Sequence, residues 1–301
     1  MRERTDSLIE PEKKEGILYV VSTPLGNLED ITLRALRVLK EVDLIAAESV
    51  GHSRGLCNRY GIRTKLTRYN QHNQKAKTPE LISKLKSGIR IALVTNAGTP
   101  GISDPGVYFV RSAIHENVRV IPVPGPSAVT SALSVSGMRG ERFLFWGFLP
   151  PKGSKRRKEL RDLASFSHSI VFFEAPHRVR EVLGEMGEIF GDRPIVLARE
   201  LTKVFEEVRR GSASSLLEKI AGDQGRGEYT LVVEGKEKQK DRPVPDEDME
   251  EAMARLLRLG SMTLRDIAQE LSSRTGIPYR DLYKQALLLK KELSFSSREP
   301  Q

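Results

Sequence analysis

A loop rich in glycine and proline, residues 95–106, constrains the fold of this chain more than any other stretch. It follows an apolar run at 89–94 and precedes a helix-like stretch that opens at Val107. A short apolar run of this kind is typical of a buried parallel strand, so the loop predicts a strand-to-helix connection. Asp104 and Pro105 predict the N-cap and the first residue of that helix. Ligands of open α/β sheets bind at such connections, although a plain tight turn is the alternative interpretation.

Apolar runs and helical periodicity alternate along most of the chain and predict the α/β fold class. A Pro-Val-Pro-Gly-Pro segment breaks this pattern in the middle and indicates two α/β domains with a cleft between them. Helical periodicity with a capping box at Thr263 and Asp266 follows a polar stretch near the C-terminus. The predicted parts are a charged N-terminal tail (1–15), two α/β domains (16–123 and 124–236), a linker (237–246) and a small three-helix, helix-turn-helix-like domain (247–293).

Cysteine and histidine content argues against disulfide and metal chemistry. Cys57 is the single cysteine, which excludes an intramolecular disulfide and a thiolate metal cage. The five histidines show no ligand spacing, so no metal site is expected. No apolar run is long enough to cross a bilayer, and the N-terminus is charged throughout, so we expect a cytoplasmic protein without a membrane anchor.

The net charge of +9 indicates a polyanionic partner. The strongest basic cluster comprises Lys152, Lys155, Arg156, Arg157 and Lys158, with a solvated helix start as the alternative interpretation. Within it, Lys155, Arg156 and Arg157 are the candidates for contacts with RNA phosphates. The C-terminal domain, by contrast, carries eight basic and eight acidic residues. Its neutrality argues against strong nonspecific nucleic-acid binding and favours a docking or packing role.

Several short motifs occur in one order along residues 16–236. They are Thr23-Pro24-Leu25-Gly26-Asn27-Leu28, Ala47-Glu48, Ala97-Gly98-Thr99-Pro100, Ser103-Asp104-Pro105-Gly106, Pro124-Gly125-Pro126, Phe172-Phe173-Glu174-Ala175-Pro176-His177-Arg178 and Ala198-Arg199-Glu200-Leu201-Thr202-Lys203. In this order they resemble the bacterial small-subunit ribosomal RNA 2′-O-ribose methyltransferase I family, within the tetrapyrrole methylase superfamily. The C-terminal helices are similar to the extension found in that family.

The resemblance implies a cofactor, a substrate and an assembly. The cofactor is S-adenosylmethionine, bound between two α/β domains, and the substrate is the ribose 2′-hydroxyl of one cytidine in the decoding region of 16S ribosomal RNA in the small ribosomal subunit. Family members usually form homodimers. Carried over to this chain, the cofactor-binding residues are Pro24, Ala97, Gly98, Thr99, Ile102, Ser127 and Ala128.

Methyl transfer to a ribose hydroxyl is an in-line displacement that benefits from alignment of the reactants and from a base near the hydroxyl. Four residues at the ends of predicted strands are the catalytic candidates. We expect Glu174 or Glu200 to act as the base and Lys203 or Arg199 as the electrostatic partner. An interdomain network of salt bridges is the alternative interpretation of these side chains.

Two rival functions are also compatible with the sequence. One is a methyltransferase of the same fold that acts on a tetrapyrrole or another small molecule, because fold does not determine substrate. The other is a noncatalytic nucleic-acid-binding protein that reads its target through the C-terminal helices. The net positive charge outside the C-terminal domain disfavours the small-molecule methyltransferase. The neutral C-terminal domain disfavours the noncatalytic nucleic-acid-binding protein.

Overall fold

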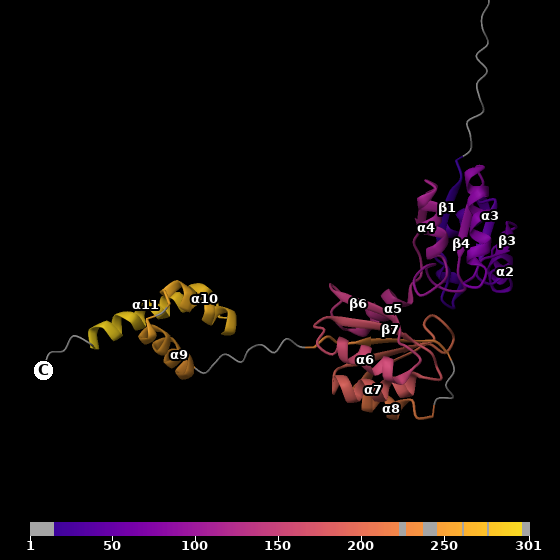
Figure 1. Cartoon of the computed structure of the whole chain (residues 1–301). Coiled ribbons are helices and arrows are strands. Elements are labelled where there is room, and N and C mark those ends of the chain that lie inside the picture. The colour runs from indigo at the N-terminus through magenta and orange to yellow at the C-terminus, as the bar shows by residue number, and fades with distance from the viewer. Residues whose placement is uncertain (1–14, 223–226, 237–245, 261, 276, 297–301) are drawn as a thin grey trace, which may run out of the picture. The chain divides into compact units, whose positions relative to one another are not determined.

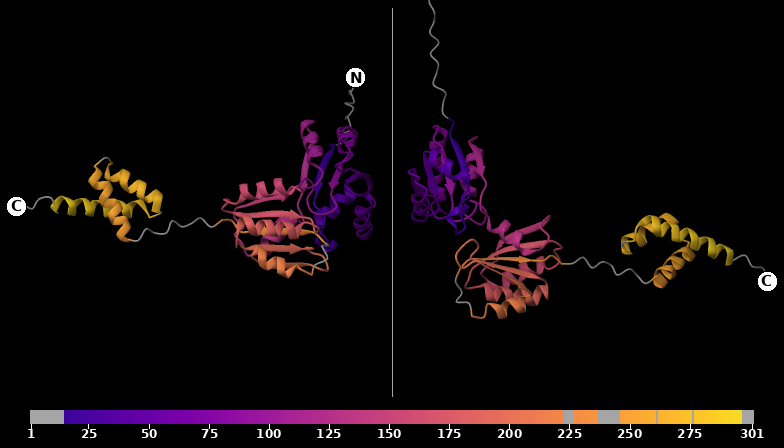
Figure 2. Two further views of the ribbon diagram at one scale, coloured as in Figure 1. Left: turned by 60° about the horizontal axis from the view of Figure 1, so that its bottom comes forward. Right: turned by 180° about the vertical axis from the view of Figure 1, so that it is seen from behind.

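The computed structural model describes residues 15–222, 227–236, 246–260, 262–275 and 277–296 (Figures 1 and 2). The chain divides into two compact units. We call Met1–Lys236 the α/β unit and Glu237–Gln301 the helical unit. The predicted tail (1–15) and linker (237–246) lie almost entirely outside the described residues.

The first sheet of the α/β unit has five parallel strands in the order β3-β2-β4-β1-β5. Its elements, in chain order, are β1 (Ile17–Val21), the short 3-10 helix η1 (Leu28–Asp30), α1 (Leu33–Glu41), β2 (Leu44–Ala47), α2 (Val50–Arg59), β3 (Lys65–Arg68), α3 (Gln74–Lys86), β4 (Ile91–Val94), α4 (Val107–His115) and β5 (Arg119–Val123). Side chains of β4 alternate between the two faces: Ala92 and Val94 pack with α1 and α2, and Ile91 and Leu93 pack with α3 and α4. Because both faces are covered, β4 is apolar throughout, and β1 and β4 end side by side at the edge where the glycine-rich loop begins.

The second sheet is mixed, with the strand order β6-β7-β10-β8-β9. Its elements are α5 (Ala128–Ser136), β6 (Phe143–Phe148), α6 (Gly153–Leu163), β7 (Ser169–Glu174), α7 (Val179–Phe190), β8 (Ile195–Arg199), β9 (Glu207–Gly211), α8 (Ala213–Lys219) and β10 (Tyr229–Val233). Only β6 and β7 pair in parallel, and the other three pairs are antiparallel. The sequence did not predict β9, because this edge strand, Glu-Val-Arg-Arg-Gly, has no apolar alternation.

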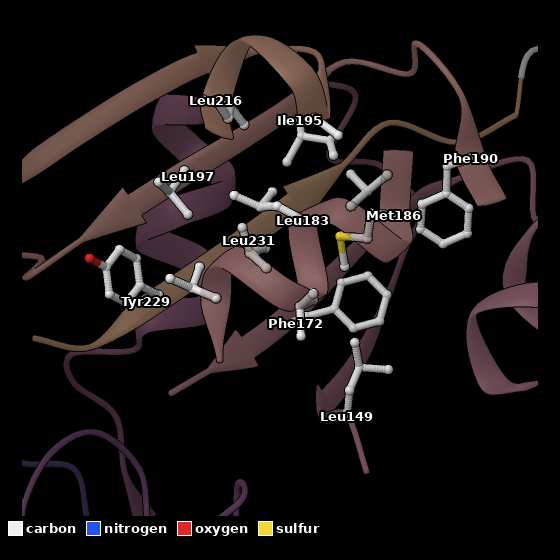
Figure 3. Packing of buried hydrophobic residues seen from close by; sticks show 14 of the residues in the cluster. Leu149, Phe172, Leu183, Met186, Phe190, Ile195, Leu197, Leu216, Tyr229 and Leu231 are labelled. Carbon is white, nitrogen blue, oxygen red and sulfur yellow. The ribbon is translucent and has the colours of Figure 1, made fainter. Parts of the chain in front are cut away.

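Two hydrophobic clusters cover opposite faces of this second sheet. Phe172 and Leu231, from the adjacent strands β7 and β10, pack against Leu183 and Met186 of α7, as Figure 3 shows. The residues next to them in sequence, such as Val171, point to the other face and pack with α5. This period of two explains why the strands of the sheet centre are apolar on both sides.

The helical unit consists of α9 (Asp246–Leu259), α10 (Leu264–Thr275) and α11 (Tyr279–Ser296) around one small core. The predicted capping box is confirmed at α10, where the Asp266 N–H donates to Thr263 Oγ1 at 3.3 Å and the Thr263 N–H donates to Asp266 Oδ2 at 3.1 Å. Among the described residues, no helix combines the length and the apolar character that a membrane crossing requires.

The predicted start of α4 was wrong. The helix begins at Val107, two residues later than expected, and its N-cap is Gly106 with φ of 144°. A positive φ of this size favours glycine, so the chain turns at Gly106 and leaves Asp104 in the loop. The carboxylate of Asp104 is therefore available for another role.

Candidate functional site

Two loops at the carboxyl edge of the first sheet are held together by a short bridge. The Thr23 N–H donates to the Gly98 carbonyl at 2.9 Å, and the Gly98 N–H donates to the Thr23 carbonyl at 3.0 Å. The hydroxyls of Ser22 and Thr99 lie 2.8 Å apart and add a side-chain hydrogen bond to the same junction. Because β1 and β4 are neighbours, the loops that follow them meet here and form a rigid backbone platform.

Most predicted cofactor residues lie on or beside this platform. Gly98 has φ of +69°, a conformation that glycine adopts without strain, while Pro24 is buried and Ile102 is 45% exposed. Ala97 and Thr99 flank Gly98 in the same loop. The platform therefore combines backbone groups with an exposed apolar side chain.

The hinge between the two sheets brings Ser127 and Ala128 close to the same edge. A Cβ atom on Gly125 would lie 3.0 Å from the Ser22 Cβ, so the hinge backbone packs directly on the end of β1. Ser127 is the N-cap of α5, yet its side chain makes no capping hydrogen bond. The Ser127 hydroxyl thus lies at a helix N-terminus without serving the helix.

Asn96 contributes an unusual polar atom to the loop. Its N–H donates to Glu48 Oε2 at 3.0 Å, which ties the loop after β4 to the end of the neighbouring strand β2. Its side-chain Oδ1 is buried and has no hydrogen-bond partner among the described residues. A buried acceptor without a donor is costly unless a ligand supplies one.

The second sheet contributes the loop after β8 to the same region. The Asn27 N–H donates to Thr202 Oγ1 at 3.0 Å. A Cβ on Gly26 would lie 2.1 Å from the Lys203 Cγ, so the Lys203 stem crosses the backbone of the first loop where only glycine fits without displacing it. The structure thus brings Lys203, a predicted catalytic candidate, against the loop that carries Pro24.

The ammonium of Lys203 joins two carboxylates. Lys203 Nζ lies 2.9 Å from Glu200 Oε1 and 3.1 Å from Glu228 Oε2. Burial alone would raise the pKa of Glu200, but hydrogen bonds from Lys203 and from the Glu228 backbone hold that pKa below its ordinary value. Burial likewise opposes the charge on Lys203, but the two carboxylates raise its pKa. A carboxylate held in its charged form by such partners is a weak base, so this geometry disfavours Glu200 in that role.

Glu174, the other predicted base, lies inside the protein. Its side chain is fully buried, and its Oε1 accepts hydrogen bonds from the Ala175 N–H at 2.8 Å and from Arg178 Nε at 2.9 Å. Its Oε2 has no partner among the described residues. A carboxylate that a macromolecular substrate cannot reach does not deprotonate it, so burial removes Glu174 from the candidates for the base.

Arg199 ends β8 beside these carboxylates. Its guanidinium carbon lies 5.8 Å from the centre of the Tyr229 ring, a cation-π contact between paired residues of β8 and β10. Arg199 is therefore anchored to the second sheet near Glu200. Its assignment as the electrostatic partner stays a prediction.

Asp104 is the residue that the sequence reasoning missed. It lies partly buried in the central loop, after Ser103, whose φ is +59°. Burial and the negative charges of Glu48 and Glu228 raise the pKa of Asp104 to about 6, against a smaller lowering by a hydrogen bond with Thr95. The signal was present in the sequence as a second acidic motif, Ser-Asp-Pro-Gly, but the carboxylate was assigned to a helix cap.

The predicted RNA contacts need one correction. Arg156 is fully buried between α6 and α7, where its Nε lies 2.6 Å from Glu185 Oε2 and its Nη2 lies 2.5 Å from Glu181 Oε1. It therefore binds α7 and is not available to RNA. Its spacing from the buried Leu160 and Leu163 already places Arg156 on the apolar stripe of the helix, a signal that the sequence reasoning overlooked.

The other two residues of the basic cluster remain at the surface. Lys155 is exposed, and Arg157 is 45% exposed while its Nε lies 3.1 Å from Glu185 Oε1. In the part of the chain that the structure describes, no group of three histidine, cysteine or acidic side chains is arranged to hold a metal ion.

Comparisons with known proteins bear on this architecture. The family of Tetrapyrrole (Corrin/Porphyrin) Methylases matches residues 17–217. The ribosomal RNA small subunit methyltransferase I of Pseudomonas aeruginosa is 42% identical over 277 residues, which cover 90% of this chain and 97% of that protein. The protein of the same name from Thermotoga maritima is 46% identical over 222 residues, which cover 74% of this chain and 100% of that protein.

Among solved structures, uroporphyrin-III C-methyl transferase from Thermus thermophilus, complexed with S-adenyl homocysteine, has a TM-score of 0.55 and 18% identity over 73% of this chain and 98% of its own. This likeness confirms the expected fold of the α/β unit. The relatives at 42% and 46% identity show which family within this fold the chain belongs to. The chain belongs to the tetrapyrrole methylase family and, within it, to the ribosomal RNA small subunit methyltransferase I family.

Proposed function

We propose that this protein transfers a methyl group from S-adenosylmethionine to the ribose 2′-hydroxyl of one cytidine in the decoding region of 16S ribosomal RNA. The observation that supports it most is the backbone platform at Thr23 and Gly98, present in a chain whose relatives over most of its length are named for this RNA. Two solvent-facing loops from different sheets, after β8 and β1, meet beside it.

The residues present fit the proposed cofactor. The buried Oδ1 of Asn96 can accept a hydrogen bond, the loop around Gly98 exposes backbone next to Ile102, and the Ser127 hydroxyl is not engaged in capping its helix. When bound, S-adenosylmethionine supplies a methyl group on a sulfonium sulfur. Ala97, Gly98, Thr99 and Ile102 of the central loop, Pro24, and the hinge residues Ser127 and Ala128 are the residues we expect to hold it.

Asp104 is the base in this proposal. With a pKa of about 6, its carboxylate is ionised at neutral pH yet remains basic enough to take a proton. The Asp104 carboxylate would take the proton of the 2′-hydroxyl, to which bound S-adenosylmethionine would supply the methyl group. Lys203, in the loop after β8, and Arg199, at the end of β8, are the proposed electrostatic partners of the acceptor.

Lys155 and Arg157 are the proposed phosphate contacts of the α/β unit, because both lie at the surface at the start of α6. We also propose that the protein acts as a homodimer in the cytoplasm, where its ribosomal substrate is found. Sedimentation of the purified chain tests the assembly: a single species of 33.7 kDa would contradict it.

The test uses radiolabelled cofactor and small ribosomal subunits that lack the modification. We expect label in one RNA fragment, on a ribose, as located by nuclease digestion and mass spectrometry. Asp104→Asn is the matched control, since it should bind the cofactor in calorimetry and transfer label about 10²–10⁴-fold more slowly. A parallel reaction contains a tetrapyrrole in place of the subunits. Label in the tetrapyrrole and none in the RNA would overturn the RNA assignment in favour of the small-molecule alternative.

A further inference from the structure

The helical unit contains an open groove of about 780 Å³ where its three helices meet. Arg258 reaches it from the last turn of α9, Arg265 from the first turn of α10, and Lys290 from α11. Tyr283 and Leu264 supply apolar surface between these cations. The groove thus combines three cations with aromatic and aliphatic side chains.

The three cations of this groove are not neutralised by the protein. All three are exposed, and none has an ion pair or hydrogen bond with another residue in the described part of the chain. The sequence explains why: none of them has a carboxylate three or four positions away on its own helix, the spacing at which helical ion pairs form. In the α/β unit, by contrast, the buried cation Arg156 binds two glutamates.

One acidic side chain, Asp266, lines the groove, and it belongs to the capping box at the N-terminus of α10. Its Oδ2 accepts hydrogen bonds from the Thr263 hydroxyl at 2.6 Å and from the Thr263 N–H at 3.1 Å. These hydrogen bonds keep the pKa of Asp266 below its ordinary value. Its charge is therefore directed to the N-terminus of α10, where it offsets the helix dipole.

The helical unit is neutral as a whole, and Asp266 is the one acidic residue among those that line the groove. Glu250 and Glu251 are exposed on the first half of α9, and Arg258 follows seven residues after Glu251. Seven residues of helix span about 10 Å, which is about the Debye length at 0.1 M salt. A polyanion in the groove therefore meets the cations while the repulsion from these glutamates is largely screened.

Aromatic surface in the groove favours a nucleic acid over a simple anion. Tyr283 stacks with Tyr279, with ring centres 5.8 Å apart and ring planes inclined by 23°. A ring that packs on a neighbouring ring loses little conformational entropy when a base stacks on it. Proteins bind unpaired RNA by stacking its bases on aromatic side chains and by contacting its phosphates with cations.

A relative of this chain has the length of the α/β unit alone and so lacks a counterpart of the helical unit. The Thermotoga maritima relative is matched over its whole length by 222 residues of this chain, about the length of the α/β unit alone. A protein of that name therefore exists without room for a second unit of this kind. The expected contribution of the helical unit is to affinity and not to the methyl transfer itself.

We propose that the groove lined by Arg258, Arg265 and Lys290 binds the sugar–phosphate backbone of ribosomal RNA away from the methylated nucleotide and so holds the substrate on the enzyme. This inference rests on the proposed function for its substrate. It assigns an RNA-docking role to the helical unit, which has no net charge, because three cations that are unpaired among the described residues line one groove of that unit.

The test compares two full-length triple variants. The groove variant is Arg258→Gln, Arg265→Gln, Lys290→Gln, and the control is Arg255→Gln, Arg280→Gln, Lys284→Gln, which removes three exposed cations of the same unit that do not line the groove. We expect the groove variant to raise the KM for small subunits by up to about 100-fold at 0.1 M salt and to reduce the slope of log KM against log salt by about 2, the effect of three lost phosphate contacts. The kcat and the cofactor Kd should not change.

Each other outcome has a defined meaning. If the groove variant keeps the wild-type KM and salt slope, or if the control loses as much affinity, the groove is not an RNA site. If binding to naked 16S RNA is unchanged in a filter assay while subunit binding falls, the partner is a ribosomal protein and the proposal fails. A wild-type chain that methylates no RNA would sink the proposed function, whereas the filter assay would still decide the docking role.

Discussion

Replacing Asp104 with asparagine tests the role of the central loop, because the change should make the protein more stable and less active. The native environment raises the pKa of Asp104 from 3.8 to about 6, so folding holds this carboxylate in unfavourable surroundings once it is charged. This difference in pKa corresponds to about 3 kcal/mol, at 1.36 kcal/mol for each unit of pKa. Asp104 is only partly buried, and solvent screening reduces the expected gain to about 1–2 kcal/mol.

The sign of the pH dependence follows from proton binding. Between about pH 4 and pH 6 the native state binds more protons at Asp104 than the unfolded state does, so the free energy of unfolding of the wild type falls as the pH rises through this window. Asparagine does not titrate. The stability advantage of Asp104→Asn should therefore be near zero at pH 4, grow to its full value by about pH 6, and stay constant above.

Two measurements check this reasoning. Thermal or denaturant unfolding of both proteins across pH 4.5–8 should give the stability difference. The pH–rate profile of the wild type should rise with a midpoint near pH 6, and the rate of Asp104→Asn should be lower by about 10²–10⁴-fold. Glu48→Gln removes a neighbouring negative charge and should shift the wild-type profile to lower pH. A variant that is less stable at pH 8, or that has a pH-independent difference, would refute the assignment.

Three further predictions concern other parts of the α/β unit. Arg156→Met leaves Glu185 buried without its main partner and should lower the free energy of unfolding by about 3–5 kcal/mol, whereas adding Glu185→Gln should recover part of the loss in a denaturant titration. Gly98→Ala forces alanine into φ of +69° at about 1–2 kcal/mol and should weaken cofactor binding in calorimetry, whereas Gly61→Ala, at φ of +63° in open space, should leave that binding unchanged. Lys155→Gln should reduce the salt slope of RNA affinity by about 0.7 with no effect on cofactor affinity, and an unchanged slope would remove Lys155 from the RNA surface.

Local patterns in the sequence predicted much of the fold correctly. The α/β alternation, the glycine-rich loop after β4 and the capping box at Thr263 all depend on residues near one another in the chain, so periodicity and turn chemistry reveal them. The resemblance to the methylase family rests on the same local motifs and is confirmed by relatives that span most of the chain. The exact domain boundaries stay predictions, as do the individual site residues other than Arg156 and Glu174, which are buried.

Errors arose where a side chain's role depends on a distant element. Arg156 looked like a surface cation because its partners, Glu181 and Glu185, lie on the next helix. The mixed pairing of the second sheet was equally hidden, because β9 is polar and its hydrogen bonds go to β8. Spacing places Arg156 on the buried stripe of its helix, but the partners of Arg156 and of β9 are decided by which element packs beside which.

The sequence by itself therefore determined the class of fold, the family and the loops that should meet a ligand, because these follow from the order of apolar runs, glycines and prolines along the chain. Only the tertiary structure decided which charges are free to act. It buries Glu174 and Arg156, engages Glu200 with Lys203, leaves Asp104 beside two other acids, and gathers Arg258, Arg265 and Lys290 around one groove of the helical unit. The physical reason is that the energy of a charge depends on its burial and on its neighbours in space, and both are set when the chain has folded.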